Sequence, residues 1–234
     1  MQSELRRDLF QLIRAAAVFA ASAVAAGAVF YTLLLEIRKH RNIVEGGIVE
    51  TAQLAILGVA CAAYAVQAVR DREKGRALAM VALAVLAMFV REMDGWFDVL
   101  TGDHSFWSYV ETPVVLAFVA IPVRRFSRTV DHLARFVSTP QCLLFVAGVA
   151  FAVVVAQLVG YKEIWNRIFD VDIWNDACAA RLLDDGRLPH DLDVSRHVKN
   201  TVEESIELAS YLLILGSAVI PPLLRSGAPE SRRA

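Results

Sequence analysis

The sequence predicts an all-α protein, a polytopic membrane bundle of about six transmembrane helices. Of its 234 residues, 56% are hydrophobic, against about 45–50% in typical soluble domains. The charged residues make up 21% of the chain and gather between long uncharged runs. The longest runs are Ala15–Leu35, Thr51–Val69, Cys142–Tyr161 and Leu208–Leu224. A helix of about 20 apolar residues crosses a bilayer core of about 30 Å, so each run is about one membrane span.

The first predicted span covers 13–35 and is flanked by three arginines of the N-terminal segment. A cleaved signal peptide is the alternative, because Ala21-Ser22-Ala23 fits a cleavage site of small residues. The apolar run continues to Leu35, however, which exceeds the about 7–15 residues of a signal-peptide core. We therefore expect this helix to be retained.

The later spans are predicted at 48–69, 77–98, 107–123, 140–161 and 203–224. The third and fourth reach full length only if they include charged neighbours of the runs Ala77–Val90 and Thr112–Val123. Buried helices of a soluble domain are the alternative for these two, but no stretch of the chain supplies a soluble shell around them. Ser138-Thr139-Pro140 predicts a capping residue and a first-turn proline at the start of the fifth span.

One membrane domain therefore covers 1–234, with an outer loop at 162–200 between the last two spans. Aromatic and branched residues recur in every fourth position at the start of this loop, at Tyr161, Trp165, Phe169 and Ile173. This spacing predicts an amphipathic helix that lies on the membrane face or packs over it.

The placement of lysine and arginine predicts the topology. One side of the predicted membrane receives 14 of these residues in short segments, and the other receives 10 at lower density. Because positive charge is retained in the cytoplasm, both termini are predicted there, in a bacterial inner (plasma) membrane. The cluster Arg38, Lys39 and Arg41 on the outer side runs against this orientation.

The overall charge and the cysteines exclude several classes. Lys+Arg is 24 and Asp+Glu is 25, a net charge of −1 that excludes a nucleic-acid binder driven by positive charge. The expected partners are membrane lipids, with other membrane subunits as the alternative. Cys61 and Cys142 lie in spans and Cys178 lies alone outside them, so neither a disulfide framework nor a paired-cysteine metal motif is expected.

Acidic residues gather at the predicted outer ends of four spans. They are Glu45, Glu50, Glu92, Asp94, Asp98, Glu111, Glu203, Glu204 and Glu207. Counted along helices from the cytoplasmic arginines, several of them lie roughly 20–30 Å across the membrane. An unpaired acid at that depth costs on the order of a few kcal/mol. Arg91 is the base nearest to this layer, and His104 and His197 lie in the adjoining loops. The set therefore requires protons, a bound cation or water.

A purely structural role is the alternative for each single acid. The helix dipole favours acids at helix starts, which accounts for Glu45, Glu50, Glu111, Glu203 and Glu204. Asp94 and Asp98 are expected to close the third helix, where the dipole disfavours an anion. The convergence of the whole set favours a site.

The donor types predict the kind of cofactor. A carboxylate-rich site without cysteine suits a divalent cation such as Ca²⁺, Mg²⁺ or Mn²⁺ better than Zn²⁺. A di-iron site expects Glu-x-x-His, and the pair Glu204 and Glu207 has the spacing without the histidine. His104 and His197 are supporting candidates, and Arg91 is expected to neutralise Asp94.

Three short motifs carry a resemblance. Glu-Gly-Gly-x-x-Glu-x-x-Gln from Glu45 to Gln53, Arg-Glu-Met-Asp-x-Trp from Arg91 to Trp96 and Glu-Glu-x-x-Glu from Glu203 to Glu207 are similar to those of small uncharacterised bacterial multi-span membrane proteins. The resemblance implies a shared architecture with an acidic layer. It implies no activity and no catalytic roles.

Three classes of function remain open. The first is a protein with an outward-facing divalent-cation site, acting on a lipid or lipid-linked substrate. The second is a proton- or cation-coupled transporter, and the third is a structural or assembly subunit of a membrane complex. In the cytoplasmic halves of the spans the polar residues are Thr32, Gln67 and Ser217, which favours a site closed on one side over a path across the membrane.

Overall fold

The computed structural model of this chain describes residues 47–103, 105–161 and 194–225, together with the single residues Ile13, Val24, Gly27, Tyr31 and Leu35. In the last segment, side chains are described for 199–219. Every regular element in these parts is a helix, which confirms the all-α class for the described chain.

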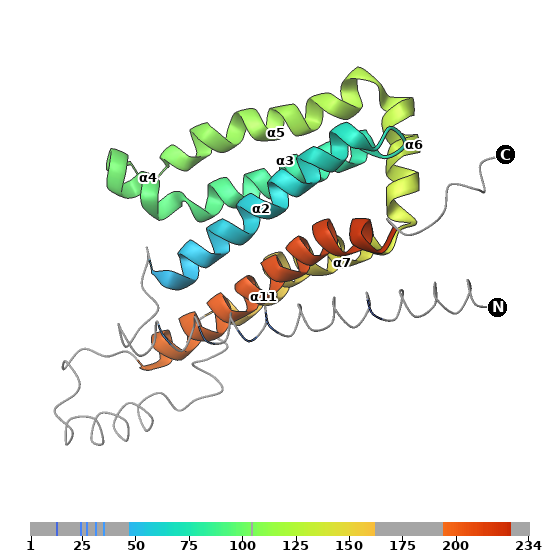
Figure 1. Ribbon diagram of the computed structural model, residues 1–234. Helices are drawn as coiled ribbons and strands as arrows, with labels where there is room; N and C mark the ends of the chain where they lie inside the picture. Colours follow the sequence, from blue (N-terminus) through green and yellow to red (C-terminus); the bar gives the residue numbers. More distant parts are fainter. Residues whose placement is uncertain are drawn as a thin grey trace, which may run out of the picture.

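The helices form an elongated bundle. Figure 1 shows α2, α3, α5, α7 and α11 running alongside one another, with α6 across one end and α4 at the other. α2 packs on both α3 and α11, while α5 packs on α3 and α7 packs on α11. The elements are α2 (Ile48–Arg70), α3 (Gly75–Glu92), α4 (Asp94–Thr101), α5 (Phe106–Arg124), α6 (Phe126–Val137), α7 (Pro140–Ala150), η1 (Phe151–Val155), α8 (Ala156–Gly160) and α11 (Val194–Arg225).

The core lies between α2, α3, α7 and α11. Its large buried side chains include Leu57 and Tyr64 on α2, Leu78 on α3 and Ile214 on α11. α7 approaches α11 most tightly at Gly148, where a Cβ atom would lie 2.7 Å from Ile214 Cγ1. Only a residue without a side chain permits this approach, so Gly148 sets the distance between the two helices.

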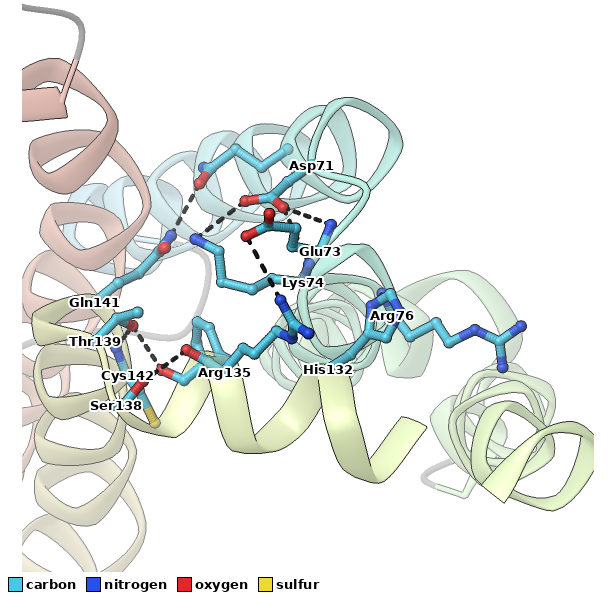
Figure 2. A network of polar contacts seen from close by, with 12 residues as sticks. Asp71, Glu73, Lys74, Arg76, His132, Arg135, Ser138, Thr139, Gln141 and Cys142 are labelled. Atoms are coloured by element: carbon cyan, nitrogen blue, oxygen red, sulfur yellow. Dashed lines mark hydrogen bonds and ion pairs between the residues drawn. The ribbon is translucent and has the colours of Figure 1, made fainter. Parts of the chain in front are cut away.

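Polar contacts join the α2–α3 turn to the start of α7 and to α6 (Figure 2). In the turn, Asp71 Oδ1 accepts the backbone N–H groups of Glu73 and Lys74, each at 3.0 Å. Lys74 Nζ lies 3.0 Å from Asp71 Oδ2. At the start of α7, the backbone N–H of Cys142 donates to Thr139 Oγ1 at 3.3 Å, so the predicted cap before Pro140 is confirmed.

Three described helices are long and apolar enough to cross a membrane: Ile48–Arg70, Phe106–Arg124 and the continuous rod Pro140–Gly160. They match the predicted spans 48–69, 107–123 and 140–161. α5 has no buried residue, as expected for a helix whose surface faces lipid. The total of six spans stays a prediction, and the predicted span 13–35 lies outside the described residues apart from the five single positions.

The third predicted span is corrected. The expected helix over 77–98 is two helices, because α3 ends at Glu92 and α4 begins at Asp94. Met93 between them leaves the α-helical conformation with ψ 6°, and Asp94 Oδ1 accepts the backbone N–H of Gly95 at 2.7 Å. Asp94 therefore opens a helix, where the dipole favours an anion, instead of closing one.

The sixth predicted span is also corrected. α11 begins at Val194, so residues 194–200 belong to a helix and not to the predicted loop at 162–200. Glu203, Glu204 and Glu207 consequently lie more than two turns inside α11, beyond the reach of its N-terminal dipole. Residues 162–173, which carry the predicted amphipathic helix after Tyr161, lie outside the described residues.

Candidate functional site

Four of the predicted acids lie together where the end of α3 meets α11. Glu92 is the last residue of α3, and Glu203, Glu204 and Glu207 lie on α11. The charges of Glu92, Glu203 and Glu204 all act on Glu207, and the charge of Glu204 also acts on Glu92. We call these four residues the carboxylate cluster. They come from parts of the chain more than 100 residues apart, so the fold brings them together.

Two neutral side chains donate hydrogen bonds to the cluster. Tyr211, buried on α11, donates its hydroxyl to Glu92 Oε1 at 2.8 Å. Gln53, buried on α2, donates Nε2 to Glu204 Oε2 at 2.8 Å. The other amide atom, Gln53 Oε1, is buried and has no hydrogen-bond partner among the described residues. Each of these two carboxylates is thus oriented by its own donor.

The bases described near the cluster each contact an acid other than Glu92 and Glu207. Arg91 pairs with Asp94, and its guanidinium carbon lies 5.0 Å from the centre of the Trp107 ring. Lys199 Nζ lies 3.4 Å from Glu203 Oε2. Arg91 acts on Glu92 and Glu207 through its charge, yet its ion-pair contact is Asp94, as the sequence predicted.

The other predicted site residues lie around the cluster or apart from it. Glu50 lies beside the start of α4, with Oε1 3.9 Å from the position that a Cβ atom on Gly95 would take. Asp98 is on α4 and Glu111 on α5, and neither is among the charges that act on Glu92 or Glu207. Glu45, His104 and the side chain of His197 lie outside the described residues.

The predicted divalent-cation constellation has no preassembled counterpart in the described parts of the chain. Among residues 47–103, 105–161 and 199–219, no three His, Cys, Asp or Glu side chains are grouped so that they could hold a metal ion. The carboxylate cluster, as the described residues form it, is therefore a group of acids with hydrogen-bond donors of its own and not a preassembled metal site.

A second group of polar side chains lies farther along α2 and α11. Gln141 Nε2 on α7 donates to Gln67 Oε1 at 2.9 Å, and Gln67 Nε2 donates to the carbonyl of Ala218 at 2.8 Å. The hydroxyl groups of Tyr64 and Ser217 share a hydrogen bond. We call Tyr64, Gln67, Gln141 and Ser217 the distal polar cluster. Ser217 is ten residues beyond Glu207, or about 15 Å along the helix.

Sequence reasoning missed several residues of both clusters. Tyr211 carried a signal, because it lies four residues after Glu207 and so shares its helix face. Gln53 stands in the first acidic motif, but its contact with Glu204 depends on the packing of α2 on α11. The expectation of few polar groups in the cytoplasmic halves named Gln67 and Ser217 but not Tyr64 or Gln141. The number of polar side chains in this part of the described spans is therefore larger than expected.

Comparisons with models of known protein families, with curated proteins and with solved structures find no match to this chain.

Proposed function

We propose that this chain is an integral membrane protein whose carboxylate cluster binds a cation in exchange with one side of the membrane, and that the cation is a proton. The observation that carries the proposal is that Tyr211 of α11 binds Glu92 at the end of α3, close enough to Glu204 and Glu207 on α11 for these carboxylates to interact through their charges. Neighbouring carboxylates repel one another when both are charged, and a surrounding of low dielectric constant strengthens the repulsion.

The ion pairs of the described bases near the cluster support the binding of a cation that the chain itself does not supply. Arg91 pairs with Asp94, and Lys199 lies against Glu203 at the edge of the cluster. Their ion-pair contacts therefore do not include Glu92 or Glu207. A group of acids at membrane depth is stable only if charge from another source compensates it.

The hydrogen bonds favour a proton. Tyr211 orients Glu92 and Gln53 orients Glu204 as separate groups. A proton needs only one carboxylate oxygen, whereas a divalent cation needs several oxygens around one point. Carboxylates that bind protons within a membrane are typical of proton relays, and hydrogen-bond donors lie beside two of these carboxylates.

A divalent cation is the second candidate, with Ca²⁺, Mg²⁺ or Mn²⁺ as the ion and a lipid or lipid-linked substrate as the molecule acted on. One observation favours it. Gln53 Oε1 is a buried carbonyl oxygen without a hydrogen-bond partner among the described residues, and its own Nε2 binds Glu204. A neutral amide oxygen beside carboxylates is the kind of ligand that these ions take.

The test is a melting series of the full chain in detergent. If the folded cluster holds one proton that the unfolded chain releases, the free energy of unfolding falls by about 1.4 kcal/mol for each pH unit. This fall occurs over the pH range in which the unfolded chain has lost the proton and the folded cluster still holds it. Glu207→Gln keeps the shape of the side chain without the charge. We expect this variant to lose the slope and to melt above the wild type at high pH.

The matched control is Glu73→Gln, an exposed acid in the α2–α3 turn at the other end of the bundle, which leaves the slope unchanged. A divalent cation at about 100 times its dissociation constant would instead raise the stability of the wild type by about 2.7 kcal/mol and leave Glu92→Gln and Glu207→Gln unaffected. That result would replace the proton by the second candidate. If pH and cations act equally on the wild type and on both variants, the site is structural.

A further inference from the structure

Helix α6 lies across the end of the bundle and joins α5 to α7 (Figure 1). Its residues Thr129 and Phe136 are buried against the bundle. Three apolar side chains on another face are exposed: Phe126 by 70%, Val130 by 47% and Val137 by 66%. Their spacing of four and seven residues places them in one row along the helix. None of the three belongs to the hydrophobic core of the described helices.

Arginines gather at the N-terminal end of α6. Arg124, Arg125 and Arg128 are exposed, and within the described chain none of them forms an ion pair. Arg135 at the other end differs, because its Nε lies 3.3 Å from Asp131 and its Nη1 lies 3.9 Å from Glu73. Three positive charges are thus concentrated at the end of α6 that carries Phe126.

Helices apolar enough to span the membrane adjoin α6 at both ends. α5 ends at Arg124, with Val119 and Val123 exposed on its last turns, and α7 starts at Pro140, with Leu143 and Val146 exposed. Lipid that surrounds α5 and α7 therefore reaches both ends of α6. A helix that lies across the ends of spanning helices lies in the plane of the membrane surface.

We propose that α6 is an interfacial helix that binds anionic phospholipids. The apolar row of Phe126, Val130 and Val137 enters the boundary between headgroups and acyl chains, and Arg124, Arg125 and Arg128 contact the lipid phosphates. An apolar face combined with arginines is the pattern of a helix bound to an anionic lipid surface. The inference is independent of the carboxylate cluster, which lies at the opposite end of the bundle (Figure 1).

The experiment measures amide hydrogen exchange of 126–137 in the full chain, reconstituted in nanodiscs of phosphatidylcholine alone or with phosphatidylglycerol. Each arginine near an anionic surface contributes about a fivefold preference, so three set an upper limit of about 100-fold. We expect exchange to be at least about tenfold slower with phosphatidylglycerol. Salt at about 1 M reduces this difference, because it shortens the screening length to about 3 Å.

Two variants separate the two parts of the surface. Combined replacement of Arg124, Arg125 and Arg128 by Gln removes the difference between the lipids, whereas Arg72→Gln in the α2–α3 turn preserves it. Val130→Ser speeds exchange of α6 in both lipids. Equal exchange of the wild type in both lipids overturns the proposal. So does protection that appears only when another protein copurifies with the chain, which would make α6 a protein-binding surface.

Discussion

Replacing Gly148 by alanine tests the contact between α7 and α11. A Cβ atom on this residue would lie 2.7 Å from Ile214 Cγ1 and 2.9 Å from the carbonyl oxygen of Ser210. Atoms in normal contact are about 3.5–4.0 Å apart, so these approaches are too short by roughly 0.6–1.3 Å. The Ile214 side chain can rotate, but the Ser210 carbonyl is backbone and cannot move without α11.

The magnitude follows from two opposing terms. Adding a methyl group to a tightly packed contact costs about 1–3 kcal/mol, and the backbone contact places Gly148→Ala in the upper part of that range. Alanine regains about 1 kcal/mol over glycine within a helix. We therefore expect a net loss of about 1–2 kcal/mol, or a melting temperature lower by roughly 2–8 °C.

The chain provides a matched control in Gly58 on α2. A Cβ atom there would lie 3.6 Å from Phe89 Cε2, which is ordinary contact. Gly58→Ala should therefore keep or raise the melting temperature, because only the helix-propensity term acts. The measurement is thermal unfolding of both variants in the same detergent, followed by circular dichroism. If Gly148→Ala is as stable as Gly58→Ala, the claim that α7 packs closely on α11 at Gly148 is refuted.

Two further predictions concern the α2–α3 turn and the topology. Burial raises the pKa of Asp71, but the Lys74 ammonium and the backbone N–H groups of Lys74 and Glu73 outweigh it and hold the pKa below its ordinary value. Its stabilisation is therefore full at neutral pH and is lost as the pH falls through the lowered pKa of the folded state. Asp71→Asn should cost about 1–2 kcal/mol at pH 7 and less at about pH 3, measured by melting at both pH values. A reporter active only in the periplasm and fused to Ala234 should give no signal, and a strong signal would reverse the predicted topology.

Uncharged runs were sufficient to predict α2, α5 and the rod Pro140–Gly160, because a helix in lipid must be apolar along most of its length. The same criterion failed at α11. Its first turns are polar, and the Lys199–Glu203 pair stabilises them without any apolar run. It also failed at α6, which is half polar and too short to span the membrane. A search for apolar residues at helical spacing would have found both.

The site was predictable in part. Depth and number selected nine acids as one set, and the structure brings Glu92, Glu203, Glu204 and Glu207 of that set close together, since the ends of antiparallel helices meet at one level. At the break after Met93 the Asp94 carboxylate accepts the backbone N–H of Gly95, a local contact that no pattern of apolar residues reveals. The donors Gln53 and Tyr211 depend on how α2, α3 and α11 rotate against one another, which is settled by packing.

Difference infrared spectroscopy measures protonation of the carboxylate cluster most directly. The C=O stretch of a protonated carboxylic acid is resolved from that of an ionised one, so the full chain is compared at about pH 5 and about pH 9, a range above the ordinary carboxyl values of about 4. The account predicts a protonated-carboxyl band in the wild type that decreases toward high pH. The band should be weaker in Glu92→Gln and Glu207→Gln and unchanged in Glu73→Gln. A wild type without this band, or a band that neither cluster variant alters, would contradict the claim that the cluster binds a proton.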